Sequence, residues 1–334
     1  MDKRMKTGLM KGGALLAAAA ALILGTKGLP NYPLIVINNT LIYFICALGL
    51  SVLLGMSGQM SFASTMFMGL AGFVVSLLSK DYKMDTVLAA LIAIAVSAAV
   101  AFLLGLALVK LKGSYFTFAT IGLAQIGSSL FLNWKWLSGG SDGRLGVPRL
   151  TLFSKEIRDG HEWLIVLVVV AVLAALITER IRKTTLGRSA ASARDNTIVA
   201  ETMGVNVYRT KLTCFVIASV YSATAGVLCT YMNRYAVESL FSYNLSVNYV
   251  LMVMLGGVNS TFGALLGSLV VTLMPEVFRS LEAYLRLIYG VMIILLMIFM
   301  PTGIVGLIDA QRKRIRRRIK ENRKAKEAEQ REQP

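Results

Sequence analysis

The stretch RIRKTTLGRSAASARDNTIVAETMGVNVYRTK (Arg180–Lys211) is a long polar interval between strongly apolar segments in the middle of the chain. It holds seven basic side chains against two acidic ones. A basic segment between membrane spans belongs on the cytoplasmic side by the positive-inside rule. Residues 189–203 predict one short helix that Gly204 ends in the left-handed conformation. Such a helix would be a docking surface for another protein. A plain loop that only orients the chain is the alternative.

The composition identifies an integral membrane protein. The 334 residues are 56% hydrophobic and 16% charged, whereas a soluble domain carries about 25% charged residues. Apolar runs long enough to cross a bilayer as helices predict an all-α polytopic membrane protein. The net charge of +17 gathers in the first eleven residues, the central loop and the tail, which favours contact with anionic membrane lipid. Nucleic acid is not an expected partner, because the basic segments flank spans and carry no interleaved aromatic residues.

The apolar runs predict about ten transmembrane helices. Because the amino terminus, the central loop and the tail are all basic, an even number of crossings must follow the central loop. Residues 246–279 must therefore hold two helices, one of which is either a full span or a re-entrant segment. The expected spans are residues 12–25 (an uncleaved span rather than a secretory signal), 34–54, 60–79, 86–109, 114–132, 163–178, 212–231, two within 246–279, and 285–300.

These spans give a simple domain organisation. Residues 1–11 form a basic cytoplasmic amino terminus, residues 12–309 form the transmembrane domain, and residues 310–334 form a basic cytoplasmic tail. Within the transmembrane domain lie the central loop (180–211) and a long loop of mixed charge (133–162), which suits the outer face. Three tryptophans at span ends predict an aromatic belt; they are Trp134, Trp136 and Trp163.

Three glycine-rich and hydroxyl-rich stretches interrupt the apolar pattern, at residues 55–65, 113–126 and 255–267. Irregular backbone survives in a membrane only where protein or a watery cavity surrounds it, and broken helices expose polar groups that can hold a zwitterionic solute. The alternative is close helix packing by small residues, which we favour for Gly263 and Gly267. The expected substrate path is lined by Gly58, Gln59, Ser61, Thr117, Thr120, Gln125, Gly256 and Gly257.

Carboxylates are nearly absent from the expected spans. Asp142, His161, Asp195 and Glu201 all lie in expected loops, whereas an ion-coupled carrier places such groups inside its bundle. The chain has no GxxxxGK[ST] motif, so nucleotide hydrolysis must come from a partner. No metal-ligand cluster or nucleophile–base pair is present. We expect no enzymatic activity and no cofactor in this chain.

Four segments together resemble the permeases of ABC importers for branched-chain amino acids, and the LivM-type subunit more than the LivH-type one. They are ARDNTIVAETMGVNVYRTKL (Ala193–Leu212), LSGGSDGRLGVP (Leu137–Pro148), VMLGGVNSTFGALLGS (Val253–Ser268) and LRLIYGVMIILLMIFMPTGIVGL (Leu285–Leu307). Two features depart from the family pattern. Thr202 follows Glu201 where importers more broadly show Glu-Ala-Ala, and Met300 precedes Pro301 where an arginine is common.

The resemblance implies an inner-membrane subunit that imports branched-chain or other hydrophobic amino acids. Its partners would be a second related permease, two cytoplasmic ATPases that bind ATP and Mg²⁺, and a periplasmic binding protein. Permeases for urea, short amides or other amino acids, and a carrier or channel acting alone, are the alternatives. The implied ATPase-docking residues are Arg188, Arg194, Asp195, Glu201 and Gly204, and the implied binding-protein contacts are Gly139, Gly140, Asp142 and Gly143.

Overall fold

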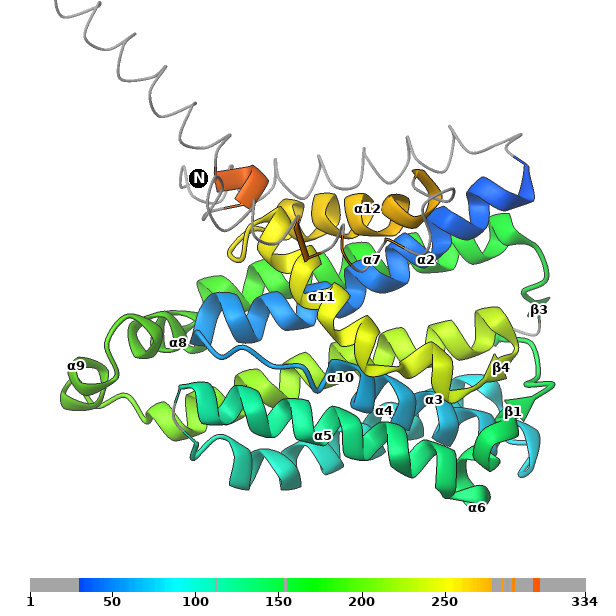
Figure 1. The fold of residues 1–334 in the computed structure, drawn as a ribbon, viewed down its shortest axis with the longest axis horizontal. Coiled ribbons are helices and arrows are strands. Elements are labelled where there is room, and N and C mark those ends of the chain that lie inside the picture. Colours follow the sequence, from blue (N-terminus) through cyan, green and yellow to red (C-terminus); the bar gives the residue numbers. More distant parts are fainter. Residues whose placement is uncertain are drawn as a thin grey trace, which may run out of the picture.

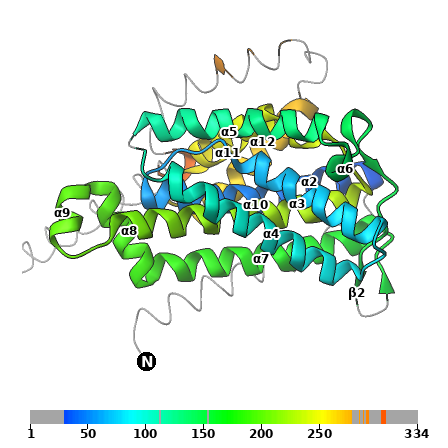
Figure 2. The ribbon, with the colours of Figure 1, turned by 90° about the horizontal axis from the view of Figure 1, so that it is seen from below.

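A computed structural model describes residues 30–111, 113–152, 155–277 and 303–306, together with the single positions 284, 287, 290 and 291. Most helices run along the long axis of the molecule (Figure 1). The helices of the central loop, α8 and α9, lie at one end, which we call the central-loop end (Figures 1 and 2). Short strands and helix α6 lie at the opposite end, which we call the hairpin end.

Helices make up nearly all of the regular structure in the described ranges. The α-helices are α2 (Asn31–Leu50), α3 (Ser64–Lys80), α4 (Thr86–Leu108), α5 (Ser114–Asn133), α6 (Lys135–Ser138), α7 (Gly160–Lys183), α8 (Thr185–Asp195), α9 (Thr197–Thr202), α10 (Val207–Asn233), α11 (Tyr243–Gly256) and α12 (Thr261–Val277). The π-helix η1 (Ser51–Met56) continues α2, and the 3₁₀-helices are η2 (Gly140–Asp142) and η3 (Glu238–Phe241). Strands β1 (Arg144–Leu145) and β4 (Tyr235–Ala236) pair antiparallel, as do β2 (Thr151–Leu152) and β3 (Lys155–Glu156).

Within the described part of the chain, six helical segments are long and apolar enough to cross a membrane, which confirms the expected all-α polytopic fold. They are Tyr32–Met56, Thr86–Leu108, Ser114–Asn133, Gly160–Lys183, Val207–Asn233 and Glu238–Gly256, and two shorter apolar helices, Ser64–Lys80 and Thr261–Glu276, join them. The expected span at 12–25, most of the one at 285–300, and the basic ends 1–11 and 310–334 lie outside the described residues.

Apolar side chains also cover the outward faces of α4 and α7. Leu91 and Leu103 on α4 are 61% and 65% exposed, and Leu173 on α7 is 53% exposed. A water-soluble protein rarely exposes contiguous apolar surface of this kind. These faces therefore fit the hydrocarbon interior of a bilayer.

Helix α10 lies at the centre of the bundle and packs against α2, α3 and α4. Its backbone approaches α3 so closely that a Cβ atom on Gly226 would lie 2.0 Å from the Met68 carbonyl oxygen. The edge-to-face ring pair of Phe67 on α3 and Phe215 on α10 adds contact toward the central-loop end. The central loop thus connects the buried helix α10 with the more peripheral helix α7.

Two helices occupy residues 246–279, as the charge distribution predicts. Helix α11 ends at Gly256 and α12 begins at Thr261. A Cβ atom on Gly267 would lie 1.8 Å from the Met252 carbonyl oxygen, and one on Gly256 would lie 1.8 Å from the Gly263 carbonyl oxygen. The packing role expected for Gly263 and Gly267 is confirmed. Gly256 was expected in the substrate path instead, and it is buried against α12 because only a bare backbone fits there.

The predicted break at residues 55–65 is present. Helix α2 ends through the π-helix η1, and residues 57–63 run back into the bundle before α3 begins (Figure 1). Helix α5 supplies partners for this coil: Thr117 Oγ1 donates to the Met60 carbonyl at 3.2 Å, and Thr120 Oγ1 accepts from the Phe62 amide at 3.2 Å. Irregular backbone is therefore satisfied by neighbouring protein, as a membrane interior requires.

The break predicted at residues 113–126 is absent. Helix α5 runs without interruption from Ser114 to Asn133, and Gly113, at φ +54°, precedes it. Within the helix, Thr120 Oγ1 donates to the Thr117 carbonyl at 2.7 Å. The hydroxyl groups here bond a carbonyl of their own helix or the adjacent coil, so their presence did not mark a break.

Replacing Gly267 with alanine should destabilise the chain, because the added Cβ would overlap the Met252 carbonyl at 1.8 Å. Overpacking of this kind costs about 1–3 kcal/mol. Thermal unfolding of the detergent-solubilised protein would show a lowered midpoint. Gly122→Ala is the control, since a Cβ atom there meets no atom within 4 Å. Equal unfolding midpoints for the two variants would contradict the close packing of α11 and α12.

Candidate functional site at the central-loop end

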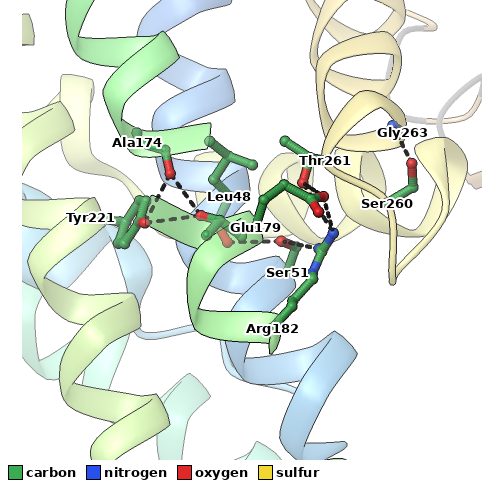
Figure 3. Close-up of polar contacts among 10 residues, drawn as sticks. Leu48, Ser51, Ala174, Glu179, Arg182, Tyr221, Ser260, Thr261 and Gly263 are labelled. Carbon is green, nitrogen blue, oxygen red and sulfur yellow. Dashed lines mark hydrogen bonds and ion pairs between the residues drawn. The ribbon is translucent and has the colours of Figure 1, made fainter. Parts of the chain in front are cut away.

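The last turns of α7, which lead into the central loop, are fixed to α10. Tyr221 of α10 donates its hydroxyl proton to the Ala174 carbonyl at 3.0 Å, and the hydroxyl oxygens of Tyr221 and Thr178 lie 2.9 Å apart (Figure 3). All of these groups are buried. Buried hydrogen bonds of this kind hold the direction of α7 where the central loop begins.

One turn further along, a partly buried ion pair links α7 with η1 and α12 (Figure 3). Arg182 Nη1 lies 3.0 Å from Glu179 Oε1, and their side chains are 16% and 28% exposed. Thr261 Oγ1 donates to Glu179 at 2.6 Å and accepts from Arg182 at 3.0 Å. Arg182 Nη2 donates to Ser51 Oγ at 3.4 Å. We call this group, made of Ser51, Glu179, Arg182 and Thr261, the bracket.

The bracket was not predicted from the sequence. The sixth span was expected to end at residue 178, so Glu179 was not taken as part of a span. A signal was available in the spacing, because Glu179 and Arg182 stand three residues apart on a predicted helix and such residues are neighbours on its surface. The contacts of Arg182 with Ser51 and Thr261 join parts of the chain that lie 131 and 79 residues away. No local pattern contains them.

The central loop forms two short helices, so the prediction of one helix over residues 189–203 is wrong. Asn196, at φ −155° and ψ 111°, separates α8 from α9. Its Oδ1 accepts from the amides of Ile198 and Val199 at 3.0 and 3.2 Å. This side chain caps α9, and a capping residue has extended rather than helical backbone. The asparagine therefore breaks the helix.

The predicted left-handed residue at the end of the loop is confirmed. Gly204 has φ +81°, its amide donates to the Glu201 carbonyl at 3.0 Å, and the Val205 amide donates to the Ala200 carbonyl at 3.0 Å. This pair of bonds is a Schellman motif, for which glycine is preferred. Ala193, Ala200 and Val207 form a small apolar cluster. Helix α9 is thereby held against α8 and the start of α10.

The far side of α9 presents apolar side chains to the outside. Ile198, Val199 and Met203 are 72%, 55% and 79% exposed, and we call them the tip. The tip was not predicted from the sequence, where the charged residues of this loop were the expected contacts. Of the predicted docking residues, Asp195 and Glu201 are exposed, and Arg188 is exposed and donates to the Lys183 carbonyl at 3.1 Å.

Arg194, another predicted docking residue, turns toward the membrane bundle instead. Its Nη1 donates to the Gly55 carbonyl at 2.6 Å, and its Nε and Nη2 donate to Asp195 Oδ1 at 3.0 and 2.9 Å. The side-chain amide of Asn259 is oriented to suit its partners. Its Oδ1 then accepts from Arg194 Nη1 at 2.9 Å, and its Nδ2 donates to the Gly55 carbonyl at 2.7 Å. Arg194 also packs on Gly58, where a Cβ atom would lie 2.7 Å from its Cγ.

The residues expected to line a substrate path divide into separate groups. Gln59 and Ser61 are buried in the coil that α5 supports through Thr117 and Thr120. Gly58 lies beside Arg194 at the central-loop end, and Gly257, at φ +114°, opens the turn between α11 and α12. Gln125 is exposed on the outward face of α5. The coil thus gathers most of these residues, and Gln125 belongs to an outer surface.

At the hairpin end, the glycines expected to contact a binding protein form tight turns. Gly139, Gly140 and Gly143 have φ of +81°, +74° and +68°, and Asp142 among them is exposed. The Arg158 guanidinium bonds Glu156 in the adjoining segment and lowers the pKa of that exposed carboxyl. This end therefore carries a charged, folded surface.

The tryptophans at the hairpin end behave differently from one another. Trp134 and Trp136 are 47% and 61% exposed, as an aromatic belt requires. Trp163 is buried in the core, so its expected place in the belt is wrong. A large ring at the start of α7 buries more apolar area when it packs among helices than when it lies at the interface.

Glu179→Gln should lower the free energy of unfolding, because it leaves Arg182 without its carboxylate in a partly buried setting. Removing one partner of a fully buried pair costs about 3–5 kcal/mol. Solvent screening at this partly exposed site reduces the expected loss to roughly 1–3 kcal/mol. Arg158→Gln, which breaks an exposed pair with Glu156, should change stability little. Chemical denaturation in detergent measures the free energy of unfolding of both variants. Equal losses in the two variants would contradict the bracket.

Comparison with known proteins agrees with the features described above. A family model described as "Branched-chain amino acid transport system / permease component" matches residues 32–300. The chain is 29% identical over 297 residues to the high-affinity branched-chain amino acid transport system permease protein LivM of Salmonella typhimurium and of Escherichia coli, which is 82% of this chain and 70% of each relative.

The permease protein LivH of Escherichia coli is 27% identical over 197 residues, covering 55% of this chain and 63% of LivH. No solved structure matches the chain. The family match extends from α2 past α12 and includes the bracket and both helices of the central loop. This chain therefore belongs to the family of permease components of branched-chain amino acid transport systems.

Proposed function

We propose that this chain is the membrane permease subunit of an ATP-binding cassette importer that moves branched-chain amino acids inward. The central observation is the combination of the exposed apolar tip on α9 with the bracket behind it. Three exposed apolar side chains on a polar loop suit a protein contact, since apolar anchors dominate interface energies. A loop held by buried polar contacts can pass a partner's movement to the helices behind it.

The complex would contain two cytoplasmic ATPases, which bind ATP and Mg²⁺, and the tip of this chain would dock on one of them. Glu201, beside the tip, and Asp195 add exposed carboxylates for a basic rim on the ATPase. The chain carries no P-loop motif. Glu179, a carboxylate within a candidate span, is already paired with Arg182. A carboxylate so engaged is poorly suited to bind a coupling ion, which favours an external source of energy.

The tip therefore lies on the cytoplasmic side and the hairpin end on the outside. The seven basic residues of the central loop support this orientation. A periplasmic binding protein would deliver its solute to the hairpin end, where the turns at Gly139–Gly143 and the charged loop offer a contact surface. The membrane would then be the inner membrane of a bacterium with a periplasm.

A second, related permease would cover the exposed face of α5, and the solute would pass between the two subunits. Gln125 and Ser129 are exposed on this face together with Gly122. Polar side chains and a glycine are poor lipid-facing groups, and they suit a helix contact or a watery path. LivM and LivH, which this chain resembles, are both permease proteins of one kind of transport system.

Branched-chain amino acids are the preferred solutes because the relatives of highest similarity described above are named for them. Urea, short amides or other amino acids are the alternatives, since a path formed by backbone and hydroxyl groups does not select an apolar side chain. A carrier acting alone is a further alternative. It differs from the proposal in requiring no ATPase.

Ile198→Asp and Met203→Asp should remove the ATPase from the purified complex. A charge in a desolvated anchor position costs about 2 kcal/mol or more of binding free energy, or roughly 30-fold in affinity. Co-purification of the tagged permease with the ATPase from membranes measures this loss. Tyr82→Asp is the control, because Tyr82 is 61% exposed but follows α3, near the hairpin end. Undiminished co-purification of both tip variants would remove the docking assignment.

Cysteine labelling tests the orientation. The native Cys46, Cys214 and Cys229 are buried, so they should react slowly with an aqueous thiol reagent. Glu201→Cys should react only after the inner membrane is permeabilised, whereas Ser141→Cys, exposed at the hairpin end, should react from the periplasmic side. Reaction of Glu201→Cys in cells with an intact inner membrane would reverse the topology and exclude an ATPase partner at the tip.

A further inference from the structure

We propose that Arg194 links the central loop to two helix breaks, the coil 57–63 after η1 and the turn 257–260 between α11 and α12, and so transmits movement of the loop to them. We call the group Arg194, Gly55 and Asn259 the clamp. The inference rests on the proposed function for the cause of that movement, which is docking of the ATPase. The contacts of the clamp do not depend on the proposed function.

The first contact of the clamp is made at the end of η1. The Gly55 carbonyl is among the last of its helix, where carbonyl groups have no intrahelical donor. Arg194 Nη1 supplies a donor at 2.6 Å. A charged donor makes a hydrogen bond stronger than a neutral one does. The start of the irregular coil 57–63 is therefore held by a residue of α8.

The second contact reaches the turn between α11 and α12. Asn259 accepts from Arg194 Nη1 at 2.9 Å and donates to the same Gly55 carbonyl at 2.7 Å. A Cβ atom on Gly55 would lie 2.4 Å from the Val258 carbonyl oxygen, so the two breaks also touch through their backbones. One guanidinium thus joins segments about residues 55, 194 and 259, which belong to three separate parts of the chain.

Arg194 is suited to this task by its planar fork of donors. Asp195 accepts from Nε and Nη2, which leaves Nη1 directed at Gly55 and Asn259. The Arg194 side chain is 33% exposed and that of Asp195 is 69% exposed. Lysine carries the same charge on a single ammonium group and cannot hold both sides in this geometry. The clamp requires the shape of arginine as well as its charge.

The contacts distinguish transmission from docking. A docking residue would direct its charged group away from the bundle, as the tip directs its apolar groups. Arg194 directs its guanidinium at the two segments where regular helix is interrupted. Because the bracket also reaches η1 through Ser51 and α12 through Thr261, the clamp is a second connection from the central loop to the same two segments. A movement of α8 would displace both breaks together.

The structural test is hydrogen–deuterium exchange on the full chain in detergent, with the variants Arg194→Ala, Arg194→Lys and Asn259→Ala. Each should increase amide exchange about tenfold in both segments, residues 55–60 and 257–263, because loss of the clamp permits local opening. Arg180→Ala is the charge-matched control. Arg180 is exposed on α7, and its side chain makes no hydrogen bond or ion pair with the side chains of the described residues. Unchanged exchange in either segment, or wild-type exchange in Arg194→Lys, would overturn the clamp.

The functional test uses the complex of permeases, ATPases and binding protein in proteoliposomes, with radiolabelled leucine as the probe. Arg194→Ala and Asn259→Ala should retain the ATPases, yet leucine taken up per ATP hydrolysed should fall about tenfold. The double variant should be no worse than either single one, since residues of one network are not additive. If Arg194→Ala lost the ATPases while Asn259→Ala retained them, Arg194 would be a docking residue and the inference would be overturned.

The two proposals fail in different ways. If the wild-type permease retained no ATPase or carried no leucine, the proposed function would fail, and the exchange experiment would still decide whether the clamp exists. If the wild type transported leucine and Arg194→Ala transported it with unchanged coupling, the proposed function would stand. The transmission role of Arg194 would then be excluded.

Discussion

The need to satisfy backbone polar groups away from water governs the organisation of this protein. A helix satisfies its own amides and carbonyls, but a break at membrane depth leaves them without partners. The chain breaks at residues 57–63 and 257–260, and side chains from elsewhere reach both places. Thr117 and Thr120 of α5 support the first break, and the guanidinium of Arg194 reaches both breaks through Gly55 and Asn259. The irregular segments are thus parts of a connected polar framework within an apolar bundle.

Part of this polar framework lies at the central-loop end. The bracket joins α7 with η1 and α12, and Arg194 joins α8 with the same region. The hairpin end also has buried polar contacts, since the Tyr231 hydroxyl bonds the Ser79 hydroxyl at 2.7 Å and the Thr86 carbonyl at 2.8 Å. Its exposed ion pairs, such as Lys155 with Glu162, contribute little to stability. At the central-loop end, the bracket and Arg194 both reach η1, so a movement of the central loop is passed to that helix.

The architecture followed from apolar run lengths and charge, because each of these is a local property of the chain. Parity of the basic segments also predicted two helices between residues 246 and 279. The single helix predicted in the central loop was wrong. Asparagine is acceptable inside a helix or as its cap, and only the tertiary fold decides which of these roles Asn196 takes. The contacts of Arg182 with Ser51 and Thr261 and those of Arg194 with Gly55 and Asn259 were not predictable, because they join segments far apart in sequence. The close contact of Gly256 with Gly263 depends on how the turn between α11 and α12 folds. Similarly, hydroxyl groups at 117 and 120 indicated a broken helix when they actually support a neighbouring coil.

The exposed tip affects how a copy of the protein is handled before it is assembled with its partners. Ile198, Val199 and Met203 expose a cluster of apolar side chains at the end of a polar loop. If the tip docks on a cytoplasmic ATPase as proposed, a newly inserted copy without that partner would expose these apolar side chains to the cytoplasm, where chaperones and proteases bind such surfaces. Under that proposal, copies in excess of the ATPase would be degraded, and the amount of permease would follow the amount of ATPase.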